Sequence, residues 1–89
     1  MSIKVKNVVE DIVMEVFNEV HPDLDCCTCE QCCSDIVAYA LNQMRPKYVS
    51  TEKGALFSKT TAAFDSSYKM EVIKVIAEGA RVVKENPRH

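Results

Sequence analysis

The sequence predicts an all-α fold: a small domain of three main helices joined by one long loop. Apolar residues recur at helical spacing in three segments, and only two glycines and three prolines interrupt the chain. At 89 residues the length fits a single domain, which we take as residues 1–89. A domain of this size buries only about 60% of its unfolded surface, so a metal ion, disulfides or a second chain commonly adds stability.

The first predicted helix covers residues 3–20. Valine, isoleucine and phenylalanine recur there every three or four residues, while lysine, asparagine and acidic residues occupy the opposite face. Ser2 is placed to cap the beginning of this helix. Its end is expected at His21, because Pro22 disfavours a helical conformation in the residue before it.

The second predicted helix runs from Glu30 to Met44, and the third runs from Thr60 to Lys84. The third helix has an apolar arc that is too broad for a helix packed on one side only. Its members are Tyr68, Val72, Ile73, Val75, Ile76, Ala77, Gly79, Ala80, Val82 and Val83. We therefore expect a homodimer that forms through the last and the first helices.

Residues 45–58 lack a helical period and are predicted to form the long loop. Tyr48 and Val49 are candidates for a short strand, and Gly54 is available for a turn with positive φ. Cations, an aromatic ring and hydroxyl groups gather here, as in sites that bind phosphorylated nucleotides. The cations are Arg45, Lys47, Lys53 and Lys59. A solvated loop with Tyr48 in the core is the alternative interpretation, and composition alone favours it.

Charge and hydropathy exclude several classes of protein. The net charge of −2 gives no excess of cations, so direct binding to nucleic acid is not expected. Charges at Lys4, Lys6, Glu10 and Asp11 break up the N-terminal apolar residues, so we expect no secretory signal. We also expect no membrane span, because no apolar run reaches the required length of about 18 residues. A cytoplasmic location is the resulting expectation, and its reducing conditions disfavour structural disulfides.

All five cysteines lie in the run CCTCEQCC at residues 26–33. Cys29 and Cys32 form a C-x-x-C pair, and Cys27 adds a third sulfur just upstream. Thiolates collected by one tight turn suit tetrahedral zinc, and the start of a helix stabilises them further. We therefore predict a structural zinc site held by Cys27, Cys29 and Cys32. Candidates for the fourth ligand are Cys33, Cys26, His21, Asp35, a water molecule or a residue of another chain.

Other interpretations of the cysteines stay open. Cys33 also fits the apolar stripe of the second helix, so a core position competes with a ligand role for this residue. A redox-active C-x-x-C pair or a disulfide is an alternative, although the βαβ context of thioredoxin-like proteins is missing. Free thiols and an iron–sulfur cluster are further alternatives, and the cysteine spacing does not match that of ferredoxins.

The sequence offers few candidates for catalysis. His21 and His89 are the only histidines, and neither the glycine-rich nucleotide-binding motifs nor the G-x-S-x-G nucleophile motif occurs. A nucleophilic Cys–His pair built with His21 has no identifiable residue to orient it. We therefore expect a protein that is not an enzyme.

The segment CTCEQCCSDIVAYALNQMRPKY, residues 27–48, resembles the signature of the late competence development ComFB family of small bacterial regulatory proteins. That signature combines a C-T-C-x-x-C run, Asp-Ile/Val, Ala-x-Ala-Leu-Asn and Pro-x-Tyr. The matching residues here are 27–32, 35–37, 38–42 and 46–48. The resemblance covers about residues 5–86, and Cys26 and Cys33 are additional to the signature.

The resemblance implies a small helical homodimer that binds zinc through these cysteines and takes part in regulation in competence and motility contexts. The leading hypothesis is therefore a non-enzymatic bacterial regulator that acts by association, with a regulatory protein as partner. Some family members are described as cyclic dinucleotide receptors. The first alternative is accordingly a receptor for cyclic di-GMP or cyclic di-AMP, with the Pro46–Gly54 loop as its binding site. The second alternative is a thiol redox protein.

Overall fold

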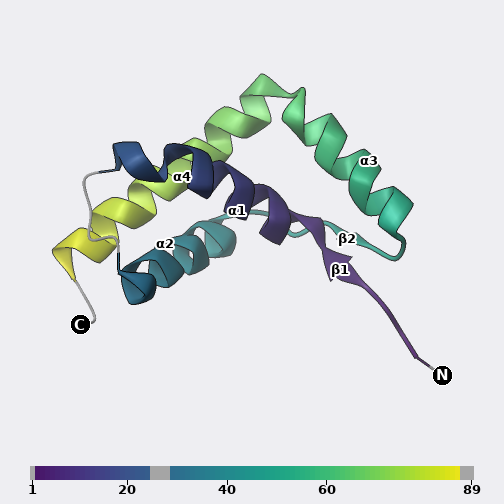
Figure 1. The fold of residues 1–89 in the computed structure, drawn as a ribbon, viewed down its shortest axis with the longest axis horizontal. Coiled ribbons are helices and arrows are strands. Elements are labelled where there is room, and N and C mark those ends of the chain that lie inside the picture. Colours follow the sequence, from purple (N-terminus) through teal and green to yellow (C-terminus); the bar gives the residue numbers. More distant parts are fainter. Residues whose placement is uncertain (1, 25–28, 87–89) are drawn as a thin grey trace.

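The computed structural model describes residues 2–24 and 29–86, which form four α-helices and a two-stranded sheet (Figure 1). The helices are α1 (Val8–Val20), α2 (Glu30–Gln43), α3 (Glu52–Ala63) and α4 (Ser66–Glu85), and a 3-10 turn, His21–Asp23, follows α1. Strands β1 (Lys6–Asn7) and β2 (Tyr48–Val49) pair in antiparallel fashion. Within the described residues, no helix is long and apolar enough to cross a bilayer.

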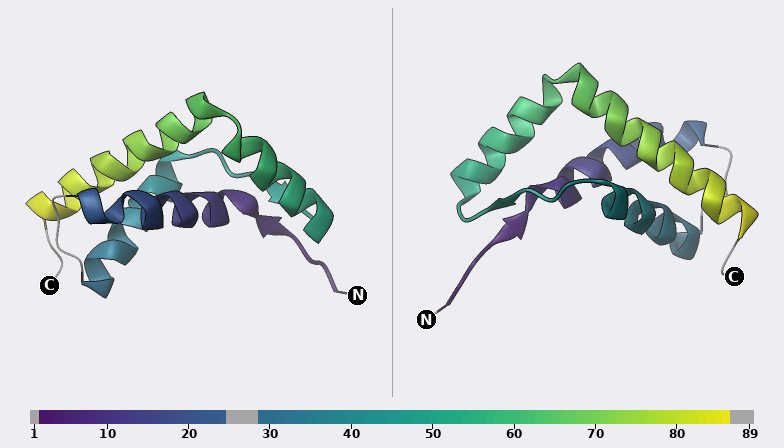
Figure 2. Two further views of the ribbon diagram at one scale, coloured as in Figure 1. Left: turned by 45° about the horizontal axis from the view of Figure 1, so that its top comes forward. Right: turned by 180° about the vertical axis from the view of Figure 1, so that it is seen from behind.

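The core of the molecule lies where α1, α2 and α4 pack together. Helix α3 precedes α4 and points away from this core at the N-terminal end of α4 (Figures 1 and 2). Val13 of α1, Ile36 of α2 and Ile76 of α4 are each fully buried there. Fully burying a side chain of this kind contributes about 1.5–3 kcal/mol relative to leaving it exposed. The three helices with the strongest apolar patterns therefore cover one another.

Most of the broad apolar arc of α4 is covered within the chain. Val72, Val75, Ile76, Gly79, Ala80 and Val83 are all buried, and α4 packs against α2, α1 and α3. The other members of the arc are less covered: Tyr68, Ile73 and Val82 are half-buried, and Ala77 is exposed. Elements of the same chain therefore account for much of the arc, and the homodimer through the last and first helices stays a prediction.

The second half of the predicted loop at residues 45–58 is helical, because α3 begins at Glu52, so the expectation of three helices was wrong by one. Thr51 caps α3, because its Oγ1 atom accepts a hydrogen bond of 2.9 Å from the backbone N–H of Gly54. Only Ala55 and Ser58 of α3 are buried, so the sequence has no apolar stripe that would indicate a helix. Gly54 lies in the first turn of α3, and no described glycine has a positive φ.

The third predicted helix is divided in two. Phe64 ends α3, and Asp65 begins α4 by accepting a hydrogen bond of 3.1 Å from the backbone N–H of Tyr68. An aspartate side chain satisfies a free N–H group at a helix start well, which makes a new helix favourable here. Residues 60–84 therefore form an elbow between α3 and α4 rather than one continuous helix (Figure 2).

The first helix begins at Val8, five residues later than predicted, and Asn7 rather than Ser2 caps it. The Asn7 Oδ1 atom accepts hydrogen bonds from the backbone N–H groups of Val9, at 3.1 Å, and Lys47, at 2.9 Å. One side chain thus caps α1 and fastens the segment before β2. The strand predicted at Tyr48 and Val49 is confirmed as β2, and the second helix is confirmed from Glu30 to Gln43.

Helices α2 and α4 approach each other most closely at Gly79. A Cβ atom at this position would lie 3.0 Å from Tyr39 Cδ1 and 3.1 Å from the carbonyl oxygen of Ile36. Glycine costs about 1 kcal/mol in a helix interior relative to alanine. Its presence in α4 is therefore explained by the close approach of α2, which leaves too little room for a side chain at this position.

Replacing Gly79 with a branched residue should push α2 and α4 apart. We expect Gly79→Val to lower the free energy of unfolding by about 1–3 kcal/mol, because overpacking of a closed core forces side chains and backbone to shift. The control is Ala77→Val, which adds the same branched residue at an exposed position of the same helix. Urea unfolding followed by circular dichroism measures both, and equal stability of the two variants would contradict the close approach at Gly79.

Candidate functional site

The side chain that caps the start of α2 carries a thiol instead of the usual oxygen atom. Cys29 has an extended backbone at the N-cap position, and its Sγ atom accepts a hydrogen bond of 3.4 Å from the backbone N–H of Cys32. The unpaired N–H groups and the positive dipole end of a helix favour the thiolate form of a cysteine. Cys29, one of the predicted metal ligands, therefore also caps α2.

The two cysteines of the first turn of α2 face different surroundings. Cys32 is only 1% exposed and belongs to the hydrophobic core. Cys33 is partly exposed, and its Sγ atom lies 3.8 Å from Nε2 of His21. Cys32 thus lies inside the core, and Cys33 packs against it while staying partly exposed.

The imidazole of His21 is held against α1. Its ring stacks on Phe17 with a centroid distance of 5.0 Å and an interplanar angle of 24°. The backbone N–H of His21 donates to the carbonyl oxygen of Phe17, which places the residue at the end of α1. The thiol of Cys33 therefore meets a fixed ring where α1 ends and α2 begins.

The predicted zinc ligands are only partly described. Cys29 and Cys32 lie at the start of α2, whereas Cys26 and Cys27 fall outside the described residues. Within residues 2–24 and 29–86, no three His, Cys, Asp or Glu side chains come together in a way that would hold a metal ion. Asp35, another candidate, accepts a hydrogen bond of 3.0 Å from the amide of Gln31. The donors present fit zinc by their chemistry, and the ligand set stays a prediction.

A groove runs between α1 and α2 beside the His21–Cys33 pair. It encloses ≈ 490 Å³, within the usual range of ligand pockets. Its walls are mainly apolar, with Met14 and Phe17 on α1 and Val37 and Leu41 on α2. The thiol and the imidazole are therefore reachable from solvent through this groove.

The four cations predicted to form a nucleotide site lie around two separate hollows. Arg45 and Lys47 line a hollow of ≈ 350 Å³ beside Tyr68. Lys53 and Lys59 line another of ≈ 530 Å³, together with Lys6 and Glu52. The separation arises because α3 carries Lys53 and Lys59 away from the segment that holds Arg45 and Lys47. Tyr48 is 64% exposed, so it does not fold into the core.

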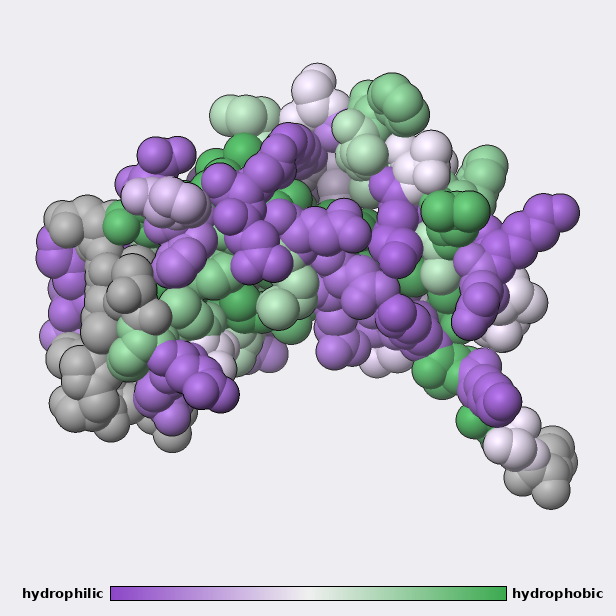
Figure 3. Space-filling model, viewed as in Figure 1, coloured by the Kyte–Doolittle hydropathy of each residue, from purple (hydrophilic) through white to green (hydrophobic). Residues whose placement is uncertain are grey.

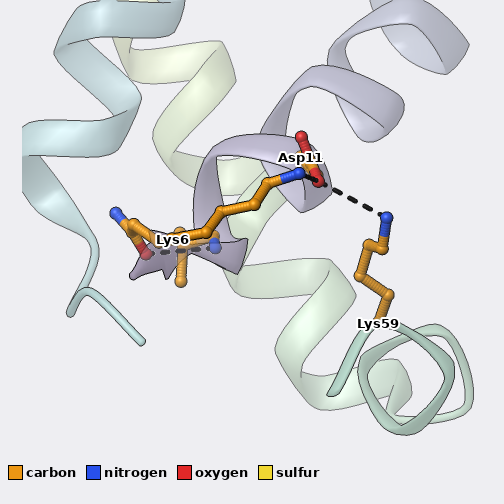
Figure 4. A network of polar contacts seen from close by, with 5 residues as sticks. Lys6, Asp11 and Lys59 are labelled. Atoms are coloured by element: carbon orange, nitrogen blue, oxygen red, sulfur yellow. Dashed lines mark hydrogen bonds and ion pairs between the residues drawn. The ribbon is translucent and has the colours of Figure 1, made fainter. Parts of the chain in front are cut away.

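Asp11 joins two of the lysines at this end of the molecule (Figure 4). Its Oδ2 atom lies 2.6 Å from Nζ of Lys6 and 3.4 Å from Nζ of Lys59. The hydrogen bond from Lys6, with a further one from Lys59, holds the pKa of Asp11 below its usual value. The same contact with Asp11 raises the pKa of Lys6. The cluster ties β1 and α1 to α3 and balances part of the positive charge.

The roles of Asp11 and Lys6 were not visible in the sequence. Lys59 is 48 residues away from Asp11 along the chain; the sequence placed Asp11 on the polar face of the first helix and Lys59 among the cations of the predicted loop. Their contact depends on α3, which the sequence did not indicate. His21 and Cys33 were each named as candidate ligands, but only the fold shows that they meet.

Comparisons with known proteins agree on one family. The sequence profile of the family described as "Late competence development protein ComFB" matches residues 6–87. The chain is 34% identical over 61 residues to the "Competence protein ComFB" of Bacillus subtilis (strain 168), a match that spans 68% of this chain and 61% of that relative. A solved structure described as the late competence protein ComFB from Bacillus subtilis superposes with a TM-score of 0.85. That match has 29% sequence identity and covers 94% of this chain and 92% of the other.

Removing the carboxylate of Asp11 should weaken the attachment of α3 in a pH-dependent manner. A lowered pKa means that Asp11 stabilises the fold above its unfolded pKa and that this contribution is lost as the pH falls through the folded pKa. We expect Asp11→Asn to be slightly less stable than the native chain at pH 7, on the scale of an exposed ion pair, and equally stable once Asp11 is protonated. The matched control is Glu10→Gln in the same turn. Urea unfolding midpoints from pH 2 to 7 measure the difference in stability between Asp11→Asn and the native chain. A difference that is constant over this range would contradict the lowered pKa of Asp11.

Proposed function

Because the chain belongs to the late competence development protein ComFB family, we propose that it is a non-enzymatic regulatory protein that acts by association, as a zinc-binding homodimer. The family description names a protein of competence development and no catalytic activity. The match covers only 61% of the length of the Bacillus subtilis relative, so a role in competence for this chain is part of the proposal. The support from this chain comes from its surface and its thiols.

The observation that carries the proposal is an exposed apolar surface on α3 and the elbow after it. Leu56, Phe57 and Phe64 are 65%, 73% and 87% exposed, and Met70 on α4 is also exposed. Hydrophobic side chains stand out over this part of the molecule in Figure 3. Several large apolar side chains exposed on one helix and the turn after it are typical of protein interfaces. This surface, which we call the α3 face, supports action by association.

A second copy of the chain is the partner that this surface fits. Helix α3 buries only Ala55 and Ser58 within its own chain, so it gains little stability from the domain that carries it. Small domains often obtain the missing burial from an identical copy, and a two-fold interface brings the same face of each copy together. The α3 face therefore takes the place of α1 and α4 as the proposed dimer contact.

Zinc in this proposal is a structural ion. Thiols drawn from Cys27, Cys29 and Cys32 hold it, and the position of Cys29 at the start of α2 supports this choice. When bound, the ion supplies a cross-link between the connection after Asp23 and the first turn of α2. The role is comparable to that of a disulfide in a chain whose core is small.

Native mass spectrometry measures the oligomer and the metal together. We expect a dimer with one zinc ion per chain, and we expect Phe57→Glu to give a folded monomer, because a buried charge would prevent association. Phe57 is 73% exposed in the single chain, so the helical content should not change. Ala77→Glu, which places the same charge at an exposed position of α4, is the control and should stay dimeric.

A native chain that is monomeric at micromolar concentration would contradict the proposed dimer. A Phe57→Glu variant that stays dimeric would contradict the α3 face as its site. A native dimer without metal, whose thiols cycle freely to disulfides, would favour the redox alternative instead.

The second candidate function is a receptor for cyclic di-GMP or cyclic di-AMP. It is favoured by the hollow of ≈ 530 Å³ that Lys6, Lys53 and Lys59 line, because several lysines around one hollow suit phosphate groups. Asp11 and Glu52 offset part of this charge, so the receptor ranks below the association hypothesis.

Calorimetric titration tests the receptor. We expect heat of binding with one of the two cyclic dinucleotides. The affinity should be at least about ten-fold lower in Lys53→Ala, because this variant loses a charge-assisted hydrogen bond worth about 1.5–3 kcal/mol. Lys74→Ala, an exposed lysine of α4, is the matched control. A folded dimer that gives no heat with either ligand would remove this candidate.

A further inference from the structure

The two most exposed large apolar side chains of the described residues lie beyond the two ends of α3. Phe64, at the elbow between α3 and α4, is 87% exposed, and Ile3, before β1, is 80% exposed. Val5, two residues after Ile3, is 63% exposed. Contact of large apolar side chains with water is unfavourable, so a surface that covered them would gain stability.

Residues 2–5, which we call the arm, precede β1 and form neither helix nor strand. The arm stands clear of the rest of the molecule in Figure 3, and in Figures 1 and 2 it leads away from the elbow. From Ile3 to Lys6 the sequence alternates between apolar and charged residues. Such alternation is typical of an extended segment with one buried side, because successive side chains point to opposite sides. The pattern therefore favours burial of the side that carries Ile3 and Val5.

The arm lies beside the first turn of α3 and not beside its end. Lys4 and Val5 line a hollow of ≈ 180 Å³ that Thr51 and Ala55 also line. The elbow lies at the other end of α3, a helix of 12 residues and therefore about 18 Å long. Since the arm leads away from the elbow, it does not cover Phe64 of its own chain.

A second copy of the chain would bring the arm and the elbow together. When two copies pack through the α3 face about a two-fold axis that crosses the helix, their α3 helices run antiparallel. The start of each α3, with its arm, then lies beside the end of the other α3. Four extended residues span about 13 Å, which is enough to cross a helix about 10–12 Å wide. An antiparallel pair of copies thus places the arm of each beside the elbow of the other.

We propose that the arm of each copy packs on the α3 face of the other, with Ile3 and Val5 of one copy covering Phe64 of the second copy. The inference rests on the homodimer proposed above and names a contact that holds it. A second copy is favoured over an unrelated partner, because both uncovered surfaces belong to the same chain and lie one helix length apart. The two-fold axis repeats the contact, so both arms are buried on one side. Lys4 lies on the other side of the arm and stays in solvent.

Mixing equal amounts of carbon-13-labelled and unlabelled chain tests the contact in the native protein. After subunit exchange, isotope-filtered NMR detects only contacts between a labelled and an unlabelled copy. The expected result is a nuclear Overhauser effect between the methyl groups of labelled Ile3 and the ring of unlabelled Phe64. A native dimer that lacks this signal, while Phe57→Glu makes it monomeric, would overturn this inference and leave the proposed dimer in place. A native chain that is monomeric would overturn both.

Substitutions in the arm test its contribution to association. Ile3→Ser should raise the dissociation constant of the dimer at least about ten-fold, because each dimer loses two buried side chains. Lys4→Ser, which makes the same change on the opposite side of the arm, is the matched control and should alter that constant by no more than about two-fold. Analytical ultracentrifugation measures the constants. Neither residue belongs to the core, so the helical content should stay native. An Ile3→Ser variant that dimerises as well as Lys4→Ser would overturn the inference.

A double-mutant cycle tests whether the arm and the elbow act through one contact. Phe64→Ala should weaken the dimer as Ile3→Ser does, and combining the two should weaken it little further, because the contact is already lost. Full additivity of the two substitutions would show that Ile3 and Phe64 act at separate places, and it would overturn the inference.

Discussion

The packing of α4 against α1 and α2 is the constraint on which the rest of the molecule depends. It buries Val72, Ile76 and Val83, and Gly79 leaves the space that lets α2 come close. Most of the apolar arc of α4 is thereby covered within the chain. The same packing brings the end of α1 beside the start of α2, so the Cys33 thiol lies 3.8 Å from His21 there. A single arrangement of three helices thus determines where the cysteines of α2 lie and which apolar side chains stay exposed.

The α3 face follows from that constraint. Helix α3 lies beyond the three-helix core, and it is attached to it by Ala55 and Ala62, which pack against the core, and by the ion pair between Lys59 and Asp11. The apolar part of this attachment is small, and a partly exposed ion pair contributes little stability. Apolar residues such as Phe57 and Phe64 therefore stay uncovered in the single chain. Association through this face would bury them and stabilise α3 at the same time, which links regulation by a partner to the folding of one helix.

The sequence predicted the parts of the fold that have strong local signals. The helices of the core, the strand at Tyr48 and the start of α2 at Glu30 were anticipated, and the resemblance carried by residues 27–48 was confirmed by the family match. Helix α3 was missed, because it buries only one narrow side and its apolar residues point outward. Periodicity shows which residues are buried but not which chain covers them, so the dimer interface expected on the first and last helices stays a prediction. The pairing of His21 with Cys33 depends on how two helices meet, and no spacing along the chain encodes it.

Hydrogen exchange of the backbone amides in the dimer and in the monomeric Phe57→Glu variant tests the central claim most directly. If α4 is covered by its own chain, the amides of α4 should be protected in the monomer as well as in the dimer. The amides of α3 should then lose protection only in the monomer, because only α3 depends on the second copy. Loss of protection along α4 in a folded monomer would mean that a partner chain covers this helix, and it would contradict the account.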